Sequence, residues 1–136
     1  MKAYRTLKRH ARCSIEPLGL GSSDFAILEL LLHRGKQPVN SIGHRVGLTS
    51  GAITSAVDRL ELQGLVVRAA NAEDRRTRFV SLTPKGTTLI RKVFRVHKRA
   101  MEGATSSLTA AEREALINLV KKLGRAAEEQ LAKRSE

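Results

Sequence analysis

A pair of short amphipathic segments joined by a tight turn, within residues 39–60, constrains the fold more than any other feature of the sequence. Apolar residues recur in both segments at helical spacing; they are Val39, Ile42 and Val46, then Ile53, Ala56, Val57 and Leu60. Gly47 follows the first segment, where a left-handed glycine ends many helices, and Thr49 or Ser50 can cap the second. Two helices joined by a short turn that contains a glycine predict a helix-turn-helix.

The hydrophobic pattern changes from a helical to an alternating period after Gly64. Two short β-branched and apolar runs, "LVVR" and "RFVSL", are separated by the polar loop "AANAEDRRT", which predicts an antiparallel hairpin with a long tip. A helix-turn-helix followed directly by a charged hairpin is typical of a winged helix. The predicted fold is therefore mainly α with a small β-hairpin wing, and further helices flank this winged helix-turn-helix core at the N- and C-terminal ends.

The charge of the chain indicates a polyanionic partner. The sequence has 25 Lys and Arg against 13 Asp and Glu, a net charge of +12, and residues 68–99 alone contain ten basic and two acidic side chains. This concentration around the hairpin indicates binding to double-stranded DNA. No apolar stretch approaches the roughly 20 residues of a membrane-spanning helix, and no segment resembles a signal peptide. We therefore expect a cytoplasmic protein that does not contact a membrane.

Amphipathic helices are also predicted outside the winged helix. Four start and stop signals bound them: Pro17 at the end of the first helix, Ser22 or Ser23 as the cap of the second, Thr83-Pro84 at the start of another, and Thr109 with Glu112 as a capping box before the last. The apolar stripes of the terminal helices need a covering surface, and a second copy of the chain supplies one. We predict a single domain over residues 1–136, with its DNA-binding part at about 22–84 and dimerisation helices at about 1–17 and 84–134.

Two groups of side chains are candidates for contacts with DNA. The second helix of the pair begins with small residues that let the backbone approach phosphates or base edges; they are Thr49, Ser50, Gly51, Thr54 and Ser55. Ordinary capping and surface positions would have the same composition. The second group is the set of loop arginines Arg75, Arg76 and Arg78, which an extended wing can place in the narrow minor groove.

These residues resemble the MarR family of winged helix-turn-helix transcriptional regulators. The likeness is carried by "SSDFAILELL", "GLTSGAITSAVDRLELQGLVVR" and, most specifically, "NAEDRRTRFVSLTPKG". The resemblance implies a homodimer on a palindromic operator, usually a repressor that a small-molecule effector releases. It also implies that Asp74 orients Arg76 toward the minor groove. Arg75 and Arg78 would then contact phosphates, and Arg59 would contact phosphate or brace the wing.

The chain departs from the family pattern at three points. Asn71 and Ala72 replace the usual Asp-Pro at the base of the wing, which predicts a looser entry into the hairpin. Gly43 replaces a common alanine in the first helix of the pair, at a cost in helix propensity of about 1 kcal/mol. The first helix of the chain is short for the family, which bears on the extent of the dimer interface.

Other functions have weaker support in the sequence. Cys13 could be a redox sensor, because Lys8, Arg9 and Arg12 nearby favour a thiolate, but a lone helical cysteine is more often a small buried hydrophobe. A metal sensor would need more converging ligands than His10, Cys13 and His97 provide. No cofactor or metal is therefore expected.

An enzyme is not expected either, since the sequence has no glycine-rich phosphate loop after a strand and no evident nucleophile spacing. The main alternative is a non-specific architectural DNA- or RNA-binding protein, for which charge alone would suffice. The shaped wing and the small residues of the second helix favour a sequence-specific regulator.

Overall fold

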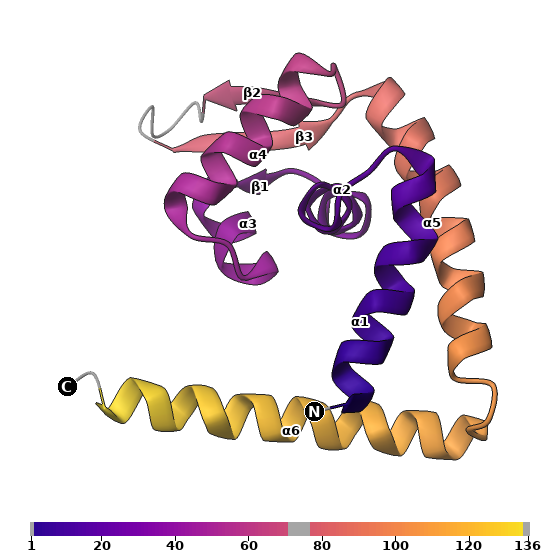
Figure 1. Ribbon diagram of the computed structural model, residues 1–136. Helices are drawn as coiled ribbons and strands as arrows, with labels where there is room; N and C mark the ends of the chain where they lie inside the picture. Colours follow the sequence, from indigo (N-terminus) through magenta and orange to yellow (C-terminus); the bar gives the residue numbers. More distant parts are fainter. Residues whose placement is uncertain (1, 71–76, 135–136) are drawn as a thin grey trace. The chain divides into compact units, whose positions relative to one another are not determined.

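The computed structural model describes residues 2–70 and 77–134 of the chain. The chain divides into two compact units, Met1–Met101 and Glu102–Glu136, which we describe separately. The elements, in chain order, are α1 (Lys2–Ile15), a short 3-10 helix η1 (Glu16–Leu18), α2 (Ser22–Arg34), β1 (Gln37–Pro38), α3 (Val39–Val46), α4 (Ser50–Leu62), β2 (Val66–Ala70), β3 (Arg78–Leu82), α5 (Pro84–Ala104) and α6 (Ala110–Arg134) (Figure 1). The predicted class, mainly helical with a small wing sheet, is confirmed. The division into DNA-binding and dimerisation parts stays a prediction.

The core of the first unit is a single apolar cluster to which α2, α3, α4, the strands and α5 all contribute. Its fully buried side chains are Ile27, Leu28, Ile42, Ile53, Val57, Leu60, Val66, Val80, Ile90 and Val93. The apolar positions that were predicted to face inward on α4 are buried, namely Ile53, Ala56, Val57 and Leu60. The opposite side of α4 is therefore left exposed.

The turn between α3 and α4 has the geometry that the sequence predicts. Gly47 has a φ of 70°, in the left-handed region, and the amide of Leu48 donates to the carbonyl oxygen of Gly43 at 2.9 Å. Thr49 is the N-cap of α4, because its hydroxyl accepts a hydrogen bond from the amide of Ala52 at 3.3 Å. These bonds fix the start of α4 relative to α3.

Gly43 allows α3 and α4 to pack closely. A β-carbon at Gly43 would lie 3.1 Å from Cγ2 of Ile53, which is tighter than nine in ten real contacts of this kind. Gly43 lowers the helix propensity of α3, and its missing side chain lets α3 and α4 approach closely.

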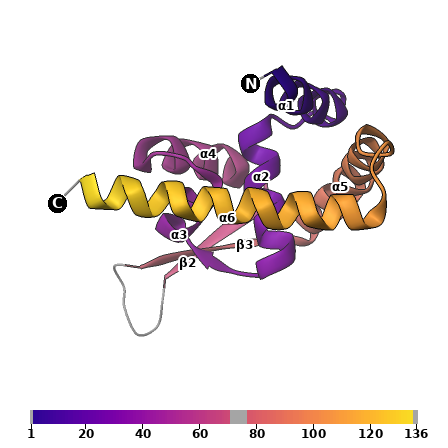
Figure 2. The same cartoon turned by 90° about the horizontal axis from the view of Figure 1, so that it is seen from below.

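The wing belongs to a three-stranded antiparallel sheet in the order β1-β3-β2. Strands β2 and β3 pair in the register Arg68 opposite Val80 and Ala70 opposite Arg78, and they run side by side in Figure 2. The hairpin is therefore confirmed, with β2 extending two residues beyond "LVVR". The additional strand β1 pairs Gln37 with Val80, and this strand was not predicted.

Two of the predicted helix starts differ in outcome. The cap of α2 was predicted at Ser22 or Ser23, and this is wrong: both residues lie inside the helix, and Gly21 occupies the N-cap position without a side-chain bond. Thr83 does cap α5, since its hydroxyl accepts a hydrogen bond from the amide of Gly86 at 3.0 Å. The same hydroxyl donates to the carbonyl oxygen of Gly64 at 2.7 Å, so the cap also joins α5 to the end of α4.

Polar contacts from His10 and Ser14 attach helix α1 to α5. Nε2 of His10 donates to the carbonyl oxygen of Ala100 at 3.0 Å. The hydroxyl of Ser14 donates to the carbonyl oxygen of Ala11, so it accepts from Nδ1 of His97, at 2.9 Å. The His97 ring also lies 4.7 Å from the ring of Phe25, centroid to centroid, which brings α2 into the same junction.

The second unit contains α6 and the turn before it. The predicted capping box is confirmed, because Glu112 accepts from the amide of Thr109 and its own amide donates to the Thr109 hydroxyl. The bonds that the amide and the hydroxyl of Thr109 donate to its carboxylate lower the pKa of Glu112 below its ordinary value. No residue within Ala110–Arg134 is buried. Large apolar side chains are exposed along this helix; they are Leu116, Ile117, Leu119, Val120, Leu123 and Leu131.

Candidate nucleic-acid interface

The small residues predicted to contact DNA lie together on the exposed side of α4 and at its start. Thr49 is the cap, and Ser50, Gly51, Thr54 and Ser55 occupy the first turns. All five are exposed, while the apolar side of the same helix is buried. The arrangement leaves a polar surface with short side chains at a helix N-terminus, where unpaired backbone amides favour anions.

The hydroxyl groups on this surface have different bonding capacities. Thr54 donates to the carbonyl oxygen of Ser50 at 2.9 Å, so its hydroxyl hydrogen is used and its oxygen can only accept from a ligand. Thr49 accepts from Ala52 and keeps its hydrogen for donation. The hydroxyls of Ser50 and Ser55 have no hydrogen bond to any described part of the chain. This surface can therefore both donate to phosphate and present acceptors to base edges.

Arg59 forms a bidentate ion pair with Asp24 at the start of α2. Its Nε and Nη2 atoms donate to the two carboxylate oxygens at 3.0 and 2.5 Å. The Asp24 side chain is only 10% exposed, whereas that of Arg59 is 49% exposed. Bonding to Asp24 raises the pKa of Arg59 above its ordinary value. The guanidinium that was predicted to contact phosphate or brace the wing thus holds α4 against α2, and its contact with DNA stays a prediction.

Arg68 of β2 is the cation that joins the wing to α4. Its Nη1 and Nη2 atoms bind Glu61 and Asp58, each at 2.5 Å. Its backbone amide also donates to Glu61, at 3.1 Å. Partial burial lowers the pKa of Arg68, but the bonds to Asp58 and Glu61 more than offset this effect, so the pKa is raised overall.

Arg68 was not among the residues predicted from the sequence to form the site. The sequence feature that could have indicated it is Asp58-Arg59-Leu60-Glu61, in which charged residues precede and follow a buried leucine. Asp58 and Glu61 are three residues apart and so lie on one side of α4, where both reach Arg68. Arg59 lies on another side and reaches Asp24.

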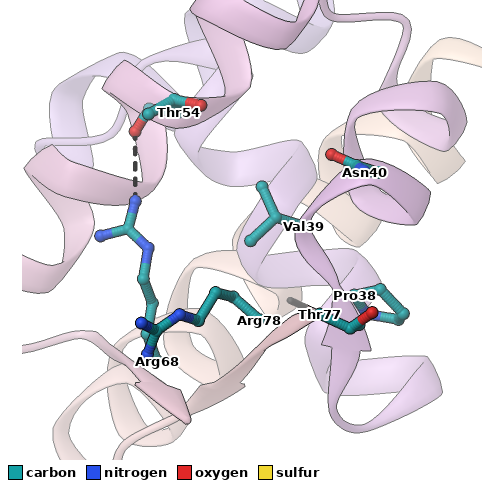
Figure 3. A pocket seen from close by; sticks show the side chains of 7 residues that line it. All are labelled: Pro38, Val39, Asn40, Thr54, Arg68, Thr77 and Arg78. Atoms are coloured by element: carbon teal, nitrogen blue, oxygen red, sulfur yellow. Dashed lines mark hydrogen bonds between the residues drawn. The ribbon is translucent and has the colours of Figure 1, made fainter. Parts of the chain in front are cut away.

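A hollow of about 270 Å³ lies between α4, the start of α3 and the wing strands (Figure 3). Its lining is mostly polar or basic and consists of Pro38, Val39, Asn40, Thr54, Arg68, Thr77 and Arg78. Arg68 extends from β2 toward the carbonyl oxygen of Thr54, at 3.5 Å. Arg78 is exposed and forms no ion pair within the described residues. It is therefore an exposed cation beside the polar side of α4.

Three of the predicted wing residues, Asp74, Arg75 and Arg76, lie outside the described residues. Their predicted roles stay predictions. The strands on either side of them are described, and the last described pair of the hairpin is Ala70 opposite Arg78.

The described residues bear differently on the other functions considered from the sequence. Within residues 2–70 and 77–134, no group of three or more His, Cys, Asp or Glu is placed to hold a metal ion. Cys13 is exposed, so its interpretation as a small buried hydrophobe is wrong, and its role as a redox sensor stays a prediction. None of the helices in the described ranges is both long and apolar enough to span a membrane.

Comparisons with known proteins agree with this architecture. Residues 20–77 match the model of the MarR family. The chain is 38% identical over 123 residues to the HTH-type transcriptional regulator MhqR of Bacillus subtilis, covering 90% of this chain and 85% of that protein. It is 32% identical to the HTH-type transcriptional repressor MdtR of the same organism, over 85% of this chain and 74% of that protein.

A solved structure of a mutant MarR from E. coli, complexed with operator DNA, is 25% identical with a TM-score of 0.78, over 88% of this chain and 86% of that one. The fold and the site thus define a winged-helix DNA-binding transcriptional regulator, a class that is not enzymatic. The chain belongs to the MarR family.

Proposed function

We propose that this protein is a homodimeric, sequence-specific repressor that binds a palindromic operator with α4 in the major groove and a wing arginine in the minor groove. The observation that carries the proposal is the exposed polar side of α4, with its cap Thr49 and its small residues beside the wing. Side chains of this size let the helix N-terminus approach phosphates and base edges closely.

The charge next to α4 supports binding to DNA. Arg78 is exposed at the hollow, and residues 68–99 contain ten basic side chains. The related MarR from E. coli was solved with operator DNA, and its fold extends over most of this chain. Binding of the phosphate backbone by these cations would add affinity, and contacts from α4 would select the sequence.

Exposed apolar side chains on helices outside the winged helix support a homodimer. Tyr4 and Leu7 are exposed on α1, and the apolar residues of α6 are exposed within its own unit. A second copy would cover these surfaces and place two copies of α4 in successive major grooves, about 34–36 Å apart. The palindromic operator follows from this two-fold arrangement.

Named relatives support repression and control by a small molecule. MdtR is named a repressor. PcaV of Streptomyces coelicolor was solved with its natural ligand and NadR with 4-hydroxyphenylacetate; both share the fold, at 23% and 22% identity. A small-molecule effector of unknown class would therefore release this protein from DNA in the cytoplasm.

Footprinting and competition on the promoter region upstream of its own gene test the proposal. We expect a protected palindrome, weak displacement by random duplex, and a dimer at micromolar concentration by analytical ultracentrifugation. Displacement by random duplex as effective as by the promoter would instead indicate a non-specific architectural protein, and a monomer would exclude the two-fold arrangement.

A further inference from the structure

We propose that Arg68 is a positioning residue that sets the direction of the wing relative to α4, so that both elements can contact one duplex. This inference rests on the proposed function. It concerns the ion cluster formed by Arg68 with Asp58 and Glu61, which we call the wing clamp.

The wing clamp fixes Arg68 at both its backbone and its side chain. The Glu61 carboxylate accepts from the backbone amide of Arg68 with one oxygen and from its guanidinium with the other. Asp58 holds the remaining side of the guanidinium. A planar cation bound by two carboxylates has little rotational freedom, and it is only 20% exposed. Strand β2 is consequently attached to α4 at a defined position and angle.

The position of Arg68 in the hairpin makes this attachment effective. Arg68 pairs with Val80, and Ala70 pairs with Arg78 two residues farther along. Because a strand rises about 3.3 Å per residue, the clamp lies roughly 7 Å from the last described pair of the wing. Strand β2 is also an edge of the described sheet, with β3 as its neighbouring strand, so the clamp joins this edge strand to α4.

The clamp is placed where its carboxylates oppose attraction to DNA. Asp58 and Glu61 lie on α4, the helix proposed to enter the major groove, and their two negative charges exceed the single charge of Arg68. A surface selected only for attraction to phosphate would omit these carboxylates. Their presence is explained if they orient the wing.

Removing a clamp carboxylate therefore tests the proposal, because electrostatic attraction alone and wing positioning predict opposite changes in operator affinity. The variants are Asp58→Asn and Glu61→Gln, which keep the side-chain shape and remove one charge each. Electrostatics alone predicts tighter binding to both operator and random duplex. Positioning predicts that operator affinity falls by about fivefold or more, within the range of coupled contacts, while affinity for random duplex does not fall. Glu16→Gln is the matched control, because Glu16 forms an exposed ion pair with Arg12 on α1.

A double-mutant cycle between Arg78 and Glu61, measured as operator affinity, is a second test. If the clamp orients the wing, Arg78→Ala should weaken operator binding much less in the Glu61→Gln background than in the unmodified chain. Additive effects would contradict the proposal. Arg68→Lys keeps the charge but cannot bridge both carboxylates, so we expect it to behave as the carboxylate variants do.

A measurement on the free protein separates this inference from the proposed function. Spin labels at Ser55→Cys and Ala70→Cys, in a Cys13→Ser background and diluted with unlabelled chain, report the distance between α4 and the wing. We expect a narrow distance distribution that broadens with Glu61→Gln or Asp58→Asn and not with Glu16→Gln. An unchanged distribution would overturn the positioning role, whereas a chain without operator preference would overturn the proposed function. Asp58 is 55% exposed, so its variant should remain folded if Glu61→Gln does not.

Discussion

A β-carbon built on Gly86 would lie 1.9 Å from the carbonyl oxygen of Leu65, a separation that real β-carbons essentially never show. That oxygen cannot easily move away, because it accepts a hydrogen bond from the amide of Thr83 at 3.1 Å. The first turn of α5 therefore lies directly against the chain where α4 leads into β2. This contact requires glycine and links the wing to the helix that follows it.

Gly86→Ala should destabilise the protein. The added methyl group must displace backbone atoms, which we expect to lower the free energy of unfolding by about 1–3 kcal/mol, despite the better helix propensity of alanine. Urea unfolding followed by circular dichroism measures the change. An unchanged midpoint would mean that α5 can shift away from Leu65 at little cost.

Gly51→Ala is the matched comparison and should have the opposite effect on stability. A β-carbon at Gly51 would meet no atom of the described chain within 4 Å, so alanine should stabilise α4 by up to about 1 kcal/mol. The same methyl group would stand on the surface proposed to approach DNA, so operator affinity should fall. Equal or tighter operator binding by a more stable variant would remove Gly51 from the interface.

Arg59→Met should destabilise the junction of α2 and α4. It removes the partner of Asp24, a mostly buried carboxylate, and we expect a loss of about 1–3 kcal/mol. Adding Asp24→Asn should recover part of this loss, because the unpaired charge is then removed. The free energies of unfolding of the two single variants and the double variant, compared with the unmodified chain, complete a double-mutant cycle. Strictly additive losses would show that the ion pair does not couple the two helices.

Arg76→Ala tests the minor-groove contact that the family resemblance implies. We expect operator binding to weaken by about 1–3 kcal/mol, the scale of one good groove contact. Arg75→Ala is the comparison, since a phosphate contact should instead reduce the salt dependence of affinity by about one unit of slope. Fluorescence anisotropy at several salt concentrations distinguishes the two effects. Retained affinity with alanine at Arg76 would exclude that residue from the interface.

The helix-turn-helix could be predicted because its signals are local. The apolar spacing of α4, the left-handed Gly47 and the capping Thr49 each depend on a few neighbouring residues, and each is confirmed. The hairpin likewise follows from short alternating runs. These signals identified the class of fold and the side of α4 that stays exposed.

Contacts between elements that are distant in the sequence could not be predicted from such local signals. The partners of Arg68 are fixed by the crossing of β2 and α4, and the partner of Arg59 is 35 residues away in the sequence. Strand β1 has two residues and includes Pro38, so it carries no periodic signal. The first two serines of α2 were misassigned as caps because Gly21 takes the extended backbone geometry of the N-cap without any side-chain bond.

The carboxylates that hold Arg59 and Arg68 also change how the total charge of +12 should be interpreted. Asp24, Asp58 and Glu61 neutralise both arginines and leave a net charge of −1 among the five side chains. A DNA duplex that binds α4 would therefore release few of its condensed counterions at that helix. In the proposed complex the ionic part of the attraction would come from cations elsewhere, and the role of α4 would be to distinguish one base sequence from another.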